Sequence, residues 1–435
     1  MRKEDVKKGS IYELDGVVPL KEALPLGIQH VLAMFLGNIS PLLIIAGMLG
    51  LSPDLKSALI QNAMFIAGAV TLVQLYPVWK VGAKLPIVMG TSSGFIGTAK
   101  AMGALYGYGA LMGASLIGGL FEMVLGFFIK PLRKLFPPVV TSLVIISIGL
   151  SLLPVGINYF GGGSGAVDFG DPKHLLVGTF VILVIIIAKQ IKGFVNNASI
   201  LIGIIAGYIL AIVLGMVDFT QVQTASWIAL PTFMPVKMEF NLEVIIAMGI
   251  MFIATTVETV GDVSGITNGG LDREATSEEL QGGVLADGLG SVVASLFGVL
   301  PNTSFSQNVG LVSVTKVVNR FTIMTGAIFL ILCGFCPKLS ALFAVMPQSV
   351  LGGAAVMMFS SIVISGIQLI TKEPMTMRNI TIVSVALGLG YGIGSSSGIL
   401  AHLPQGIQLI FGGSGIVPAA IVAIIFNIIL PKDAE

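Results

Sequence analysis

The sequence predicts an all-α polytopic membrane protein, and three observations carry this prediction. The 435 residues are 55% hydrophobic and only 10% charged, with a mean hydropathy of +0.97, whereas soluble proteins carry roughly a quarter charged residues. Apolar stretches of about 20 residues, the length needed to cross a bilayer, recur along the whole chain. Lys and Arg collect in alternate connections between these stretches, as they do in the cytoplasmic loops of membrane proteins.

The apolar stretches divide into fourteen predicted membrane segments, of which the third and the tenth are short. They cover residues 26–50, 56–78, 92–101, 104–129, 135–153, 174–188, 196–217, 242–266, 280–299, 306–315, 320–336, 345–370, 379–397 and 405–430. If the N-terminus lies inside, eighteen of the 23 Lys and Arg fall on the cytoplasmic side. We therefore expect both termini to be cytoplasmic, and the net charge of +1 argues against a nucleic-acid partner.

The two short segments indicate an internal repeat. Each follows a strand-like or broken stretch that begins with Leu-Pro, LPIVMGTSSGF at Leu85 and LPNTSFSQN at Leu300, 215 residues apart. The first and eighth segments show a similar echo, because AMF at residue 33 returns as IMF at residue 250. Seven spans followed by seven spans must cross the membrane in opposite directions. This is the inverted-repeat plan of many secondary transporters, whose substrate site lies near the midplane where discontinuous helices meet.

The second short segment carries an amide pair, Gln307 and Asn308, in a chain otherwise built from small and aliphatic residues. Pro86 and Pro301 remove backbone donors, and the Gly, Ser and Thr residues that follow permit an extended approach to a half-helix whose free N–H groups face the midplane. A planar amide there can present a donor and an acceptor to a planar ligand. The alternative is that both amides only cap the half-helix.

Three acids fall inside predicted spans, where a charge is costly and usually faces a functional interior. Glu258 and Asp262 are four residues apart and therefore share a helix face, and Asp287 lies in the next span. A carboxylate in such a place can carry a proton across the membrane. The alternative for Asp262 and Asp287 is a structural role, held by backbone N–H or hydroxyl donors. Glu122 is also intramembrane, but away from the broken segments, which favours a role in helix packing.

Other candidate residues give weaker signals. His30 is the one histidine of three placed inside a span, and the alternative to a functional role is a hydrogen-bonded packing residue. Cys333 and Cys336 form a C-x-x-C without a second pair or a nearby His, so we interpret them as packing residues and expect no metal site. No nucleophile–base pair, metal cluster or phosphate loop appears, so we expect neither an enzyme nor a resident cofactor.

The motif Gln307-Asn308-x-Gly310-x-x-x-x-Thr315-Lys316 resembles the signature of the nucleobase-ascorbate transporter family, [QEP]-N-x-G-x-x-x-x-T-[RKG], at every specified position. Further landmarks of the family follow in the expected order along nearly the whole chain: QH at residue 29, GTSSGF at residue 90, ETVGD at residue 258 and ADG at residue 286. The oxidised-purine branch, for xanthine and uric acid, is the one the chain resembles, because uracil carriers usually have Glu at the position of Gln307 and His at that of Asp262.

The resemblance implies a division into two domains. A core domain would comprise residues 26–130 and 242–337, and a gate domain residues 131–218 and 338–435. Residues 1–25 would form a cytoplasmic N-terminal segment and residues 219–241 an extracytoplasmic loop. Family members are symporters of the cell membrane that move the core against the gate, and many are homodimers joined through their gate domains. We expect the same of this chain.

The resemblance also implies roles for individual residues. Glu258 would hydrogen-bond the ring nitrogens of the base and Gln307 would read its opposite edge, while Asn308 and His30 would support the pocket. The substrate-binding set would be completed by Ser93, Phe95 and Ser306. Glu258, Asp262 and Asp287 would couple transport to protons, although sodium stays open as the coupling ion.

One departure from the family pattern affects the predicted pocket. Many members have SFxF where this chain has Ser92-Ser93-Gly94-Phe95, so the aromatic ring that stacks on the base is missing at Ser93. Phe95 could take its place from two residues on, which leaves open whether the substrate is xanthine or uric acid.

The alternatives to a proton-coupled xanthine symporter are a carrier of uracil or another nucleobase and, in a different class, an anion exchanger of the same architecture. An exchanger should show a cationic site between the half-helices, but no Lys or Arg lies between Gly298 and Thr315.

Overall fold

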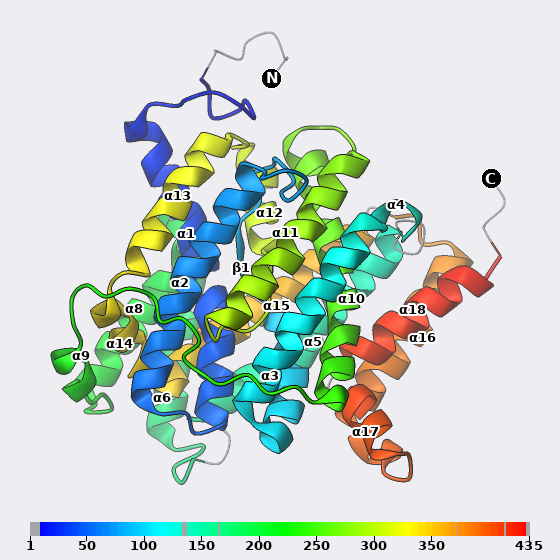
Figure 1. Cartoon of the computed structure of the whole chain (residues 1–435). Helices are drawn as coiled ribbons and strands as arrows, with labels where there is room; N and C mark the ends of the chain where they lie inside the picture. The colour runs from blue at the N-terminus through cyan, green and yellow to red at the C-terminus, as the bar shows by residue number, and fades with distance from the viewer. Residues whose placement is uncertain (1–8, 133–136, 164–165, 372, 413–414, 432–435) are drawn as a thin grey trace.

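The structure is a computed structural model that describes residues 9–132, 137–163, 166–371, 373–412 and 415–431. Figure 1 shows a bundle of helices around two short strands. The first half contains α1 (Leu20–Met48), α2 (Pro53–Leu75), β1 (Met89–Thr91), η2 (Ser93–Phe95), α3 (Ile96–Phe127), α4 (Ile129–Leu132), α5 (Pro138–Phe160), α6 (Pro172–Gln190), α7 (Phe194–Asn197), α8 (Ser199–Val213) and α9 (Thr220–Thr224). The second half contains α10 (Leu242–Gly270), α11 (Ser277–Leu296), β2 (Asn302–Ser304), α12 (Ser306–Thr315), α13 (Arg320–Cys333), α14 (Pro337–Ala344), α15 (Gln348–Ile370), α16 (Met377–Ser395), η4 (Ser397–Leu400), α17 (Gln405–Gly412) and α18 (Ile416–Ile429).

Several of these helices can cross a membrane. Within the described residues, seven are long and apolar enough, namely α1, α2, α3 with η2, α5, α6, α10 and α15. The pair α13 and α14, bent by 82°, makes an eighth if it counts as one span, and α8 and α18 are shorter apolar helices. The chain is therefore a multi-pass membrane protein. The count of fourteen segments stays a prediction, because helix length and composition alone do not fix it.

The structure moves some of the predicted boundaries. The predicted segments 92–101 and 104–129 form one continuous element that breaks at Gly107, whose φ of 80° and ψ of 172° are non-helical. A residue without a Cβ adopts this conformation at little cost, so the chain reverses there and not at residues 102–103 as we expected. The predicted final segment, 405–430, is divided into α17 and α18, and the predicted loop 219–241 contains the short helix α9.

The strand-like character predicted before both short segments is confirmed. β1 and β2 pair antiparallel, with Met89 opposite Ser304 and Thr91 opposite Asn302. Two stretches from corresponding places in the two halves of the chain thus meet in opposite directions, as an inverted repeat requires. The tenth predicted segment, 306–315, coincides with α12.

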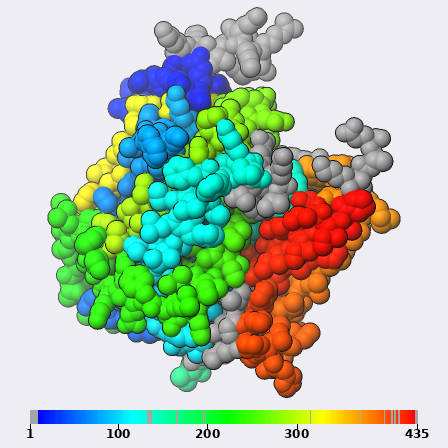
Figure 2. All heavy atoms as spheres, turned by 45° about the vertical axis from the view of Figure 1, so that its right-hand side comes forward, coloured from blue at the N-terminus to red at the C-terminus, as the bar shows by residue number. Residues whose placement is uncertain are grey.

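The helices pack in two sets. α3 packs against α10 and α11, and α2 packs against α13, whereas α5 packs against α15, α6 against α8 and α16 against α18. Figure 2 shows α16 to α18, in orange and red, as a layer beside the cyan and green segments. α10, the helix that carries Glu258, contacts α5, and α12 contacts α15, so the two sets meet along α10 and α12. The division into a core and a gate domain stays a prediction.

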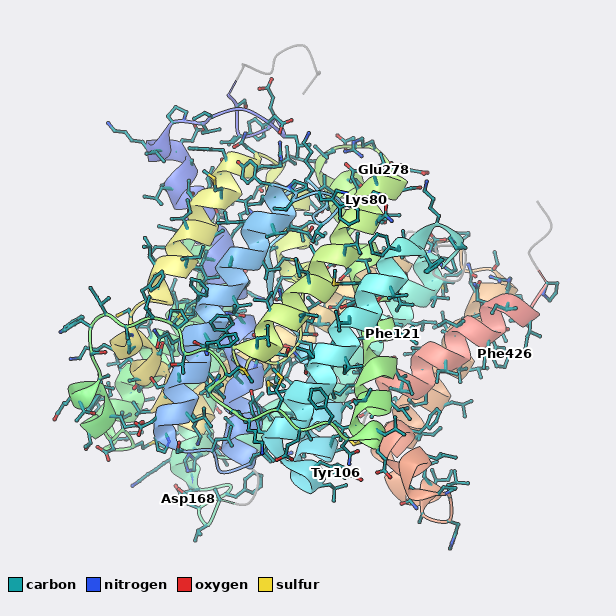
Figure 3. The ribbon with its side chains drawn as sticks, viewed as in Figure 1. Lys80, Tyr106, Phe121, Asp168, Glu278 and Phe426 are labelled. Atoms are coloured by element: carbon teal, nitrogen blue, oxygen red, sulfur yellow. The ribbon has the colours of Figure 1, made fainter. Side chains whose placement is uncertain are left out.

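The start of α1 and the end of α18 both point toward the upper side of Figure 1. Figure 3 places Lys80 and Glu278 on that side, and Tyr106 and Asp168 on the opposite side. The assignment of the upper side to the cytoplasm stays a prediction. Some of the basic residues behind that assignment lie outside the described residues, namely Arg2, Lys3, Lys7, Lys8, Arg133, Lys134, Lys372 and Lys432.

Candidate functional site

The candidate site lies where the two broken segments cross. η2 and α12 both begin directly after a strand of the central pair, so both helices start in the middle of the bundle. The crossing segments satisfy each other's backbone, because Ser92 N donates to Pro301 O over 2.8 Å and Phe305 N donates to Val88 O over 3.0 Å. Irregular backbone at membrane depth is tolerated where protein covers it in this way. Polar groups can therefore be held beside the half-helix ends.

Glu258 stands out because its buried carboxylate accepts no hydrogen bond from the described residues. The residue lies in the middle of α10 and only 7% of its surface is exposed. Its Oε2 atom is buried without a hydrogen-bond partner, and within the described residues no side chain or backbone group donates to either oxygen. Buried polar atoms are almost always paired, so an orphaned carboxylate oxygen indicates a place for a ligand or a proton.

Asp262 and Asp287 are held differently. Ser304 Oγ and Ser306 Oγ donate to Asp262 over 2.6 and 2.8 Å. Asp287 accepts hydrogen bonds from Thr259 and, over 3.4 Å, from Thr303.

A further contact of 3.4 Å between Ser304 Oγ and Thr259 Oγ1 links the two carboxylates. The link runs through hydroxyl groups alone, from Asp287 through Thr259 and Ser304 to Asp262. Each hydroxyl can accept as well as donate, but it donates only one proton, and Ser304 and Thr259 give theirs to Asp262 and Asp287. The structure therefore brings the two predicted coupling acids to the two ends of a row of neighbouring hydroxyl groups from α10 and β2.

The two amides of the signature motif differ in their hydrogen bonds. Asn308 is 1% exposed, and its Nδ2 donates to His30 O over 2.9 Å and lies 3.2 Å from His30 Nδ1. These contacts tie α12 to α1, which places the buried His30 behind the half-helix. Gln307 is half-buried, and its side chain makes no hydrogen bond within the described residues. The donor and the acceptor of the Gln307 amide are therefore both unbonded, and the role of Gln307 in reading a base stays a prediction.

The first half-helix is packed more tightly. Phe95 is fully buried, and its ring lies 4.8 Å from that of Phe252 at an interplanar angle of 59°. Ser93 is half-buried at the start of η2, and the Ser92 side chain caps the turn by accepting from Gly94 N. In this structure the Phe95 ring packs against Phe252 of α10. The role of Phe95 in stacking on a base stays a prediction.

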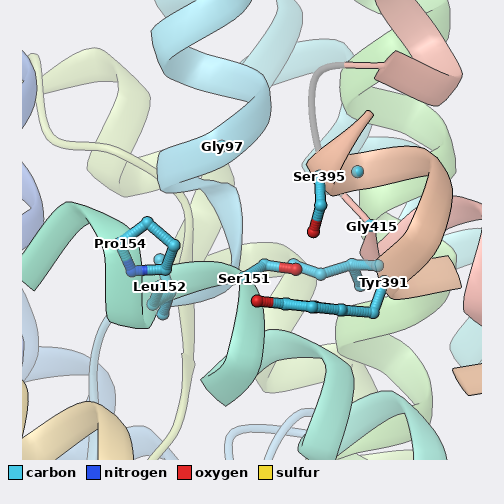
Figure 4. A pocket seen from close by; sticks show the side chains of 9 residues that line it. Gly97, Ser151, Leu152, Pro154, Tyr391, Ser395 and Gly415 are labelled. Atoms are coloured by element: carbon cyan, nitrogen blue, oxygen red, sulfur yellow. The ribbon is translucent and has the colours of Figure 1, made fainter. Parts of the chain in front are cut away.

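Two cavities flank the crossing. One of about 350 Å³ is lined by Asp262 and Gly261 of α10, by Ser306 and Gly310 of α12, and by residues of α5 and α15. The other, of about 390 Å³, lies between Gly97 of α3 and residues of α5, α16 and α18; Ser151, Tyr391 and Ser395 point toward it in Figure 4. Both cavities therefore lie between the two packed sets of helices.

Two buried polar residues were missed by the sequence analysis as parts of this region. Asn38 of α1 accepts from Thr91 N over 2.8 Å and donates to Ala63 O over 3.1 Å, so it fixes the end of β1 to α1 and α2. Glu122 of α3 accepts from Thr255 Oγ1 and Thr256 Oγ1, each over 3.2 Å. It therefore contacts the helix that carries Glu258, although sequence distance suggested a place away from the site. Its only signal in the sequence is an acid inside a span.

The described residues contain no group of three or more His, Cys, Asp and Glu side chains arranged to hold a metal ion. Cys333 and Cys336 are both free thiols.

A helical membrane protein whose half-helices meet at a polar site has the architecture of a transporter. Its fold is similar to that of a solved structure, murine solute carrier 26 family member A9, an anion transporter in the inward-facing state, with a TM-score of 0.63 over 94% of this chain and 68% of that one. At 11% identity this likeness concerns the fold alone.

Sequence comparison goes further, because residues 21–397 match the profile of the Permease family. The chain belongs to this family, the nucleobase-ascorbate transporters, and is a permease and not an enzyme.

Individual relatives cover almost the whole chain. A Clostridium perfringens protein provisionally named a purine permease is 38% identical over 100% of this chain and 96% of its own length. The uric acid transporter UacT of Escherichia coli is 34% identical over 96% of this chain and 87% of its own. The xanthine permease XanP of Escherichia coli is 32% identical over 98% of this chain and 95% of its own.

Proposed function

We propose that this chain is a proton-coupled symporter that imports xanthine, with uric acid as a second substrate, across the cell membrane. The observation that carries the proposal is Glu258, a buried carboxylate with no donor, on the helix that also carries Asp262 beside α12. Relatives named for xanthine and for uric acid support the substrate class.

Base recognition follows from the groups that the site leaves free. Xanthine presents N–H donors and C=O acceptors on its edges. The Glu258 carboxylate accepts from ring N–H groups, and the Gln307 amide donates to a carbonyl and accepts from an N–H on another edge. A neutral amide also avoids the repulsion that a carboxylate at residue 307 would exert on anionic urate. Gln307 thus favours oxidised purines over uracil.

Coupling follows from charge. A proton on Glu258 or on its neighbours removes a buried negative charge, so the loaded core moves against the gate at lower cost. The cavities of about 350 and 390 Å³ lie between the two packed sets of helices, so a movement of one set against the other would change both cavities. We also propose cytoplasmic termini and a homodimer through the gate helices. Light scattering of the purified protein, corrected for detergent, tests the dimer; a monomer mass overturns it.

The test is uptake of radiolabelled xanthine by cells expressing the chain, with unlabelled urate, uracil, guanine and hypoxanthine as competitors. We expect competition by xanthine and urate, and loss of uptake by roughly a hundredfold in Glu258→Gln, because a buried charge-assisted contact to the base is lost. Unaltered uptake by Glu258→Gln would sink the assigned role. Competition chiefly by uracil would favour the alternative within the same family.

A second experiment separates the coupling ions. In proteoliposomes we expect accumulation to follow an imposed pH gradient and to be indifferent to sodium. Accumulation that follows sodium and ignores the pH gradient contradicts proton coupling. Chloride, sulfate or bicarbonate exchange without xanthine transport would favour an anion exchanger; the structural neighbour is an anion transporter.

A further inference from the structure

Glu122 of α3 and Asp287 of α11 meet behind the candidate site. A Cβ on Gly288 would lie 2.6 Å from Gly119 O and 2.7 Å from Met123 N, so the two helices touch backbone to backbone. Glu122 and Asp287 are the direct neighbours of residues in this crossing. The glycines therefore bring two acids from distant parts of the sequence together.

α10 confirms the proximity from a third direction. Thr255 donates to Glu122 and Thr259 donates to Asp287. Residues four apart lie one turn from each other on the same helix face. Two carboxylates bound to successive turns of one helix face are therefore neighbours.

In each of the two acids, one carboxylate oxygen accepts a hydrogen bond and the other has no partner among the described residues. Glu122 and Asp287 are both 0% exposed. Hydroxyl groups donate to Glu122 Oε1 and Asp287 Oδ2, but Glu122 Oε2 and Asp287 Oδ1 are buried without a partner. The threonines do not neutralise them, because a hydroxyl donates a hydrogen bond but carries no charge.

The charged groups that face Glu122 are acids as well. They are Asp287 from α11 and Glu258 from α10, and Asp262 of α10 in turn acts on Asp287. α5 and α17, which also pack on α3, contain no charged residue, and His30 of α1 is bound to Asn308. α4 packs on α3 and α11, but its Lys130 is exposed. Within the described residues no cation faces this group of carboxylates, and two ionised carboxylates so close in a dry interior repel each other strongly.

We propose that Glu122 and Asp287 share a proton and form a second proton-holding pair of the transport cycle, behind the substrate site. This inference rests on the proposed proton coupling. Glu122 is a positioning residue, because it does not touch the substrate; it acts through Asp287 and through the threonine face of α10 that leads to Glu258. The proton on the pair allows Asp287 to keep its hydrogen bonds while Glu258 is loaded and unloaded.

The test compares Glu122→Gln with the parent protein in proteoliposomes, by two readouts. Xanthine binding and the exchange of labelled for unlabelled xanthine need no net proton movement, and we expect both to change by less than about twofold, since Gln keeps the shape and an acceptor for the threonines. Accumulation driven by a pH gradient should fall by tenfold or more, and proton uptake per xanthine, followed with an internal pH dye, should fall with it.

Two further variants keep the test decisive if Glu122→Gln is poorly folded. Glu122→Asp keeps a titratable group and should restore part of the pH-driven accumulation. Thr255→Val with Thr256→Val keeps the acid but removes its donors, and should shift the pH profile of uptake. Glu243→Gln, at the far end of α10, is the matched control and should change neither readout.

The outcomes separate this inference from the proposed function. A parent protein that accumulates xanthine without moving protons overturns proton coupling and this inference with it. A proton-coupled parent whose Glu122→Gln variant accumulates normally with an unchanged pH profile overturns the pair alone, and leaves Glu122 as a packing residue.

Discussion

The two half-helices occupy corresponding places in the repeat but differ in what they leave free. The first begins with a turn capped by Ser92, and its Phe95 is fully buried against Phe252. The second begins without a side-chain cap, Gln307 is half-buried and unbonded, and a cavity of about 350 Å³ opens along Ser306 and Gly310. A cavity also lies beside the first half-helix, at Gly97, so the difference is in the side chains: the first half-helix packs its aromatic ring against α10, whereas the second leaves an amide unbonded.

The largest expected effect tests this asymmetry directly. Gln307→Ala removes a free donor and acceptor, and we expect xanthine uptake to fall by roughly tenfold or more, since a lost ligand hydrogen bond costs about 1–3 kcal/mol and 1.4 kcal/mol is about tenfold. Ser93→Ala, at the start of the first half-helix, should reduce uptake by less than about threefold. Initial rates at several xanthine concentrations measure both, and equal losses would break the comparison.

A second prediction concerns the strand that precedes the first half-helix. A Cβ on Gly90 would lie 2.7 Å from the Phe305 ring and 2.8 Å from both Asn38 Oδ1 and Met34 Cε. Gly90→Val should therefore destabilise the protein by about 1–3 kcal/mol through overpacking and lower its Tm in detergent. Gly94→Ala is the control, because the nearest atom to a new Cβ there is Ser92 Oγ at 3.4 Å. A Tm equally low in both variants would contradict the packing argument.

A third prediction sharpens the description of the first half-helix, whose aromatic ring packs against α10. Phe95→Leu removes the ring contact with Phe252, and aromatic pairs contribute about 0.5–1.5 kcal/mol beyond burial, so we expect a modest loss of Tm. The ratio of xanthine to urate affinity should stay within about twofold of the parent value. Competition binding measures it, and a larger change in the ratio would show that the ring reaches the base.

The smallest effect is expected outside the spans. The hydrogen bond from His174 Nε2 to Asp168 Oδ2, 2.8 Å long, holds the pKa of Asp168 below its ordinary value. A lowered pKa in the folded state stabilises the protein above the unfolded value of about 3.9, and this contribution is lost as the pH falls through the lower folded value. Asp168→Asn should therefore lower Tm slightly at pH 7 and not at more acid pH, with uptake unchanged. A large loss of uptake would extend the functional region to this loop.

Much of the fold was predictable because its signals are local. Length and hydropathy located the helices, Leu-Pro followed by small polar residues located both broken segments, and α12 runs over residues 306–315 as predicted. The break at Gly107 was misplaced, because its positive φ depends on how the chain turns and not on hydropathy.

The candidate site was predictable only in part. Glu258, Asp262 and Gln307 were found because a motif and a carboxylate within a span mark them. The place of Glu122 depends on Gly119 and Gly288, and the direction of Phe95 on Phe252. Both are contacts between residues far apart in the chain, which a periodic pattern cannot reveal.

The antiparallel pairing of β1 with β2 has a consequence for biosynthesis. Within the first half, Met89 N donates to Thr71 Oγ1 and Thr91 N to Asn38 Oδ1, but the strand partners of residues 89–91 are residues 302–304. The first half therefore enters the membrane with a strand that still lacks its pairing strand. Neither half can complete its fold alone. Two separately encoded halves should yield a working permease only when they are made together, and each half made alone should be degraded.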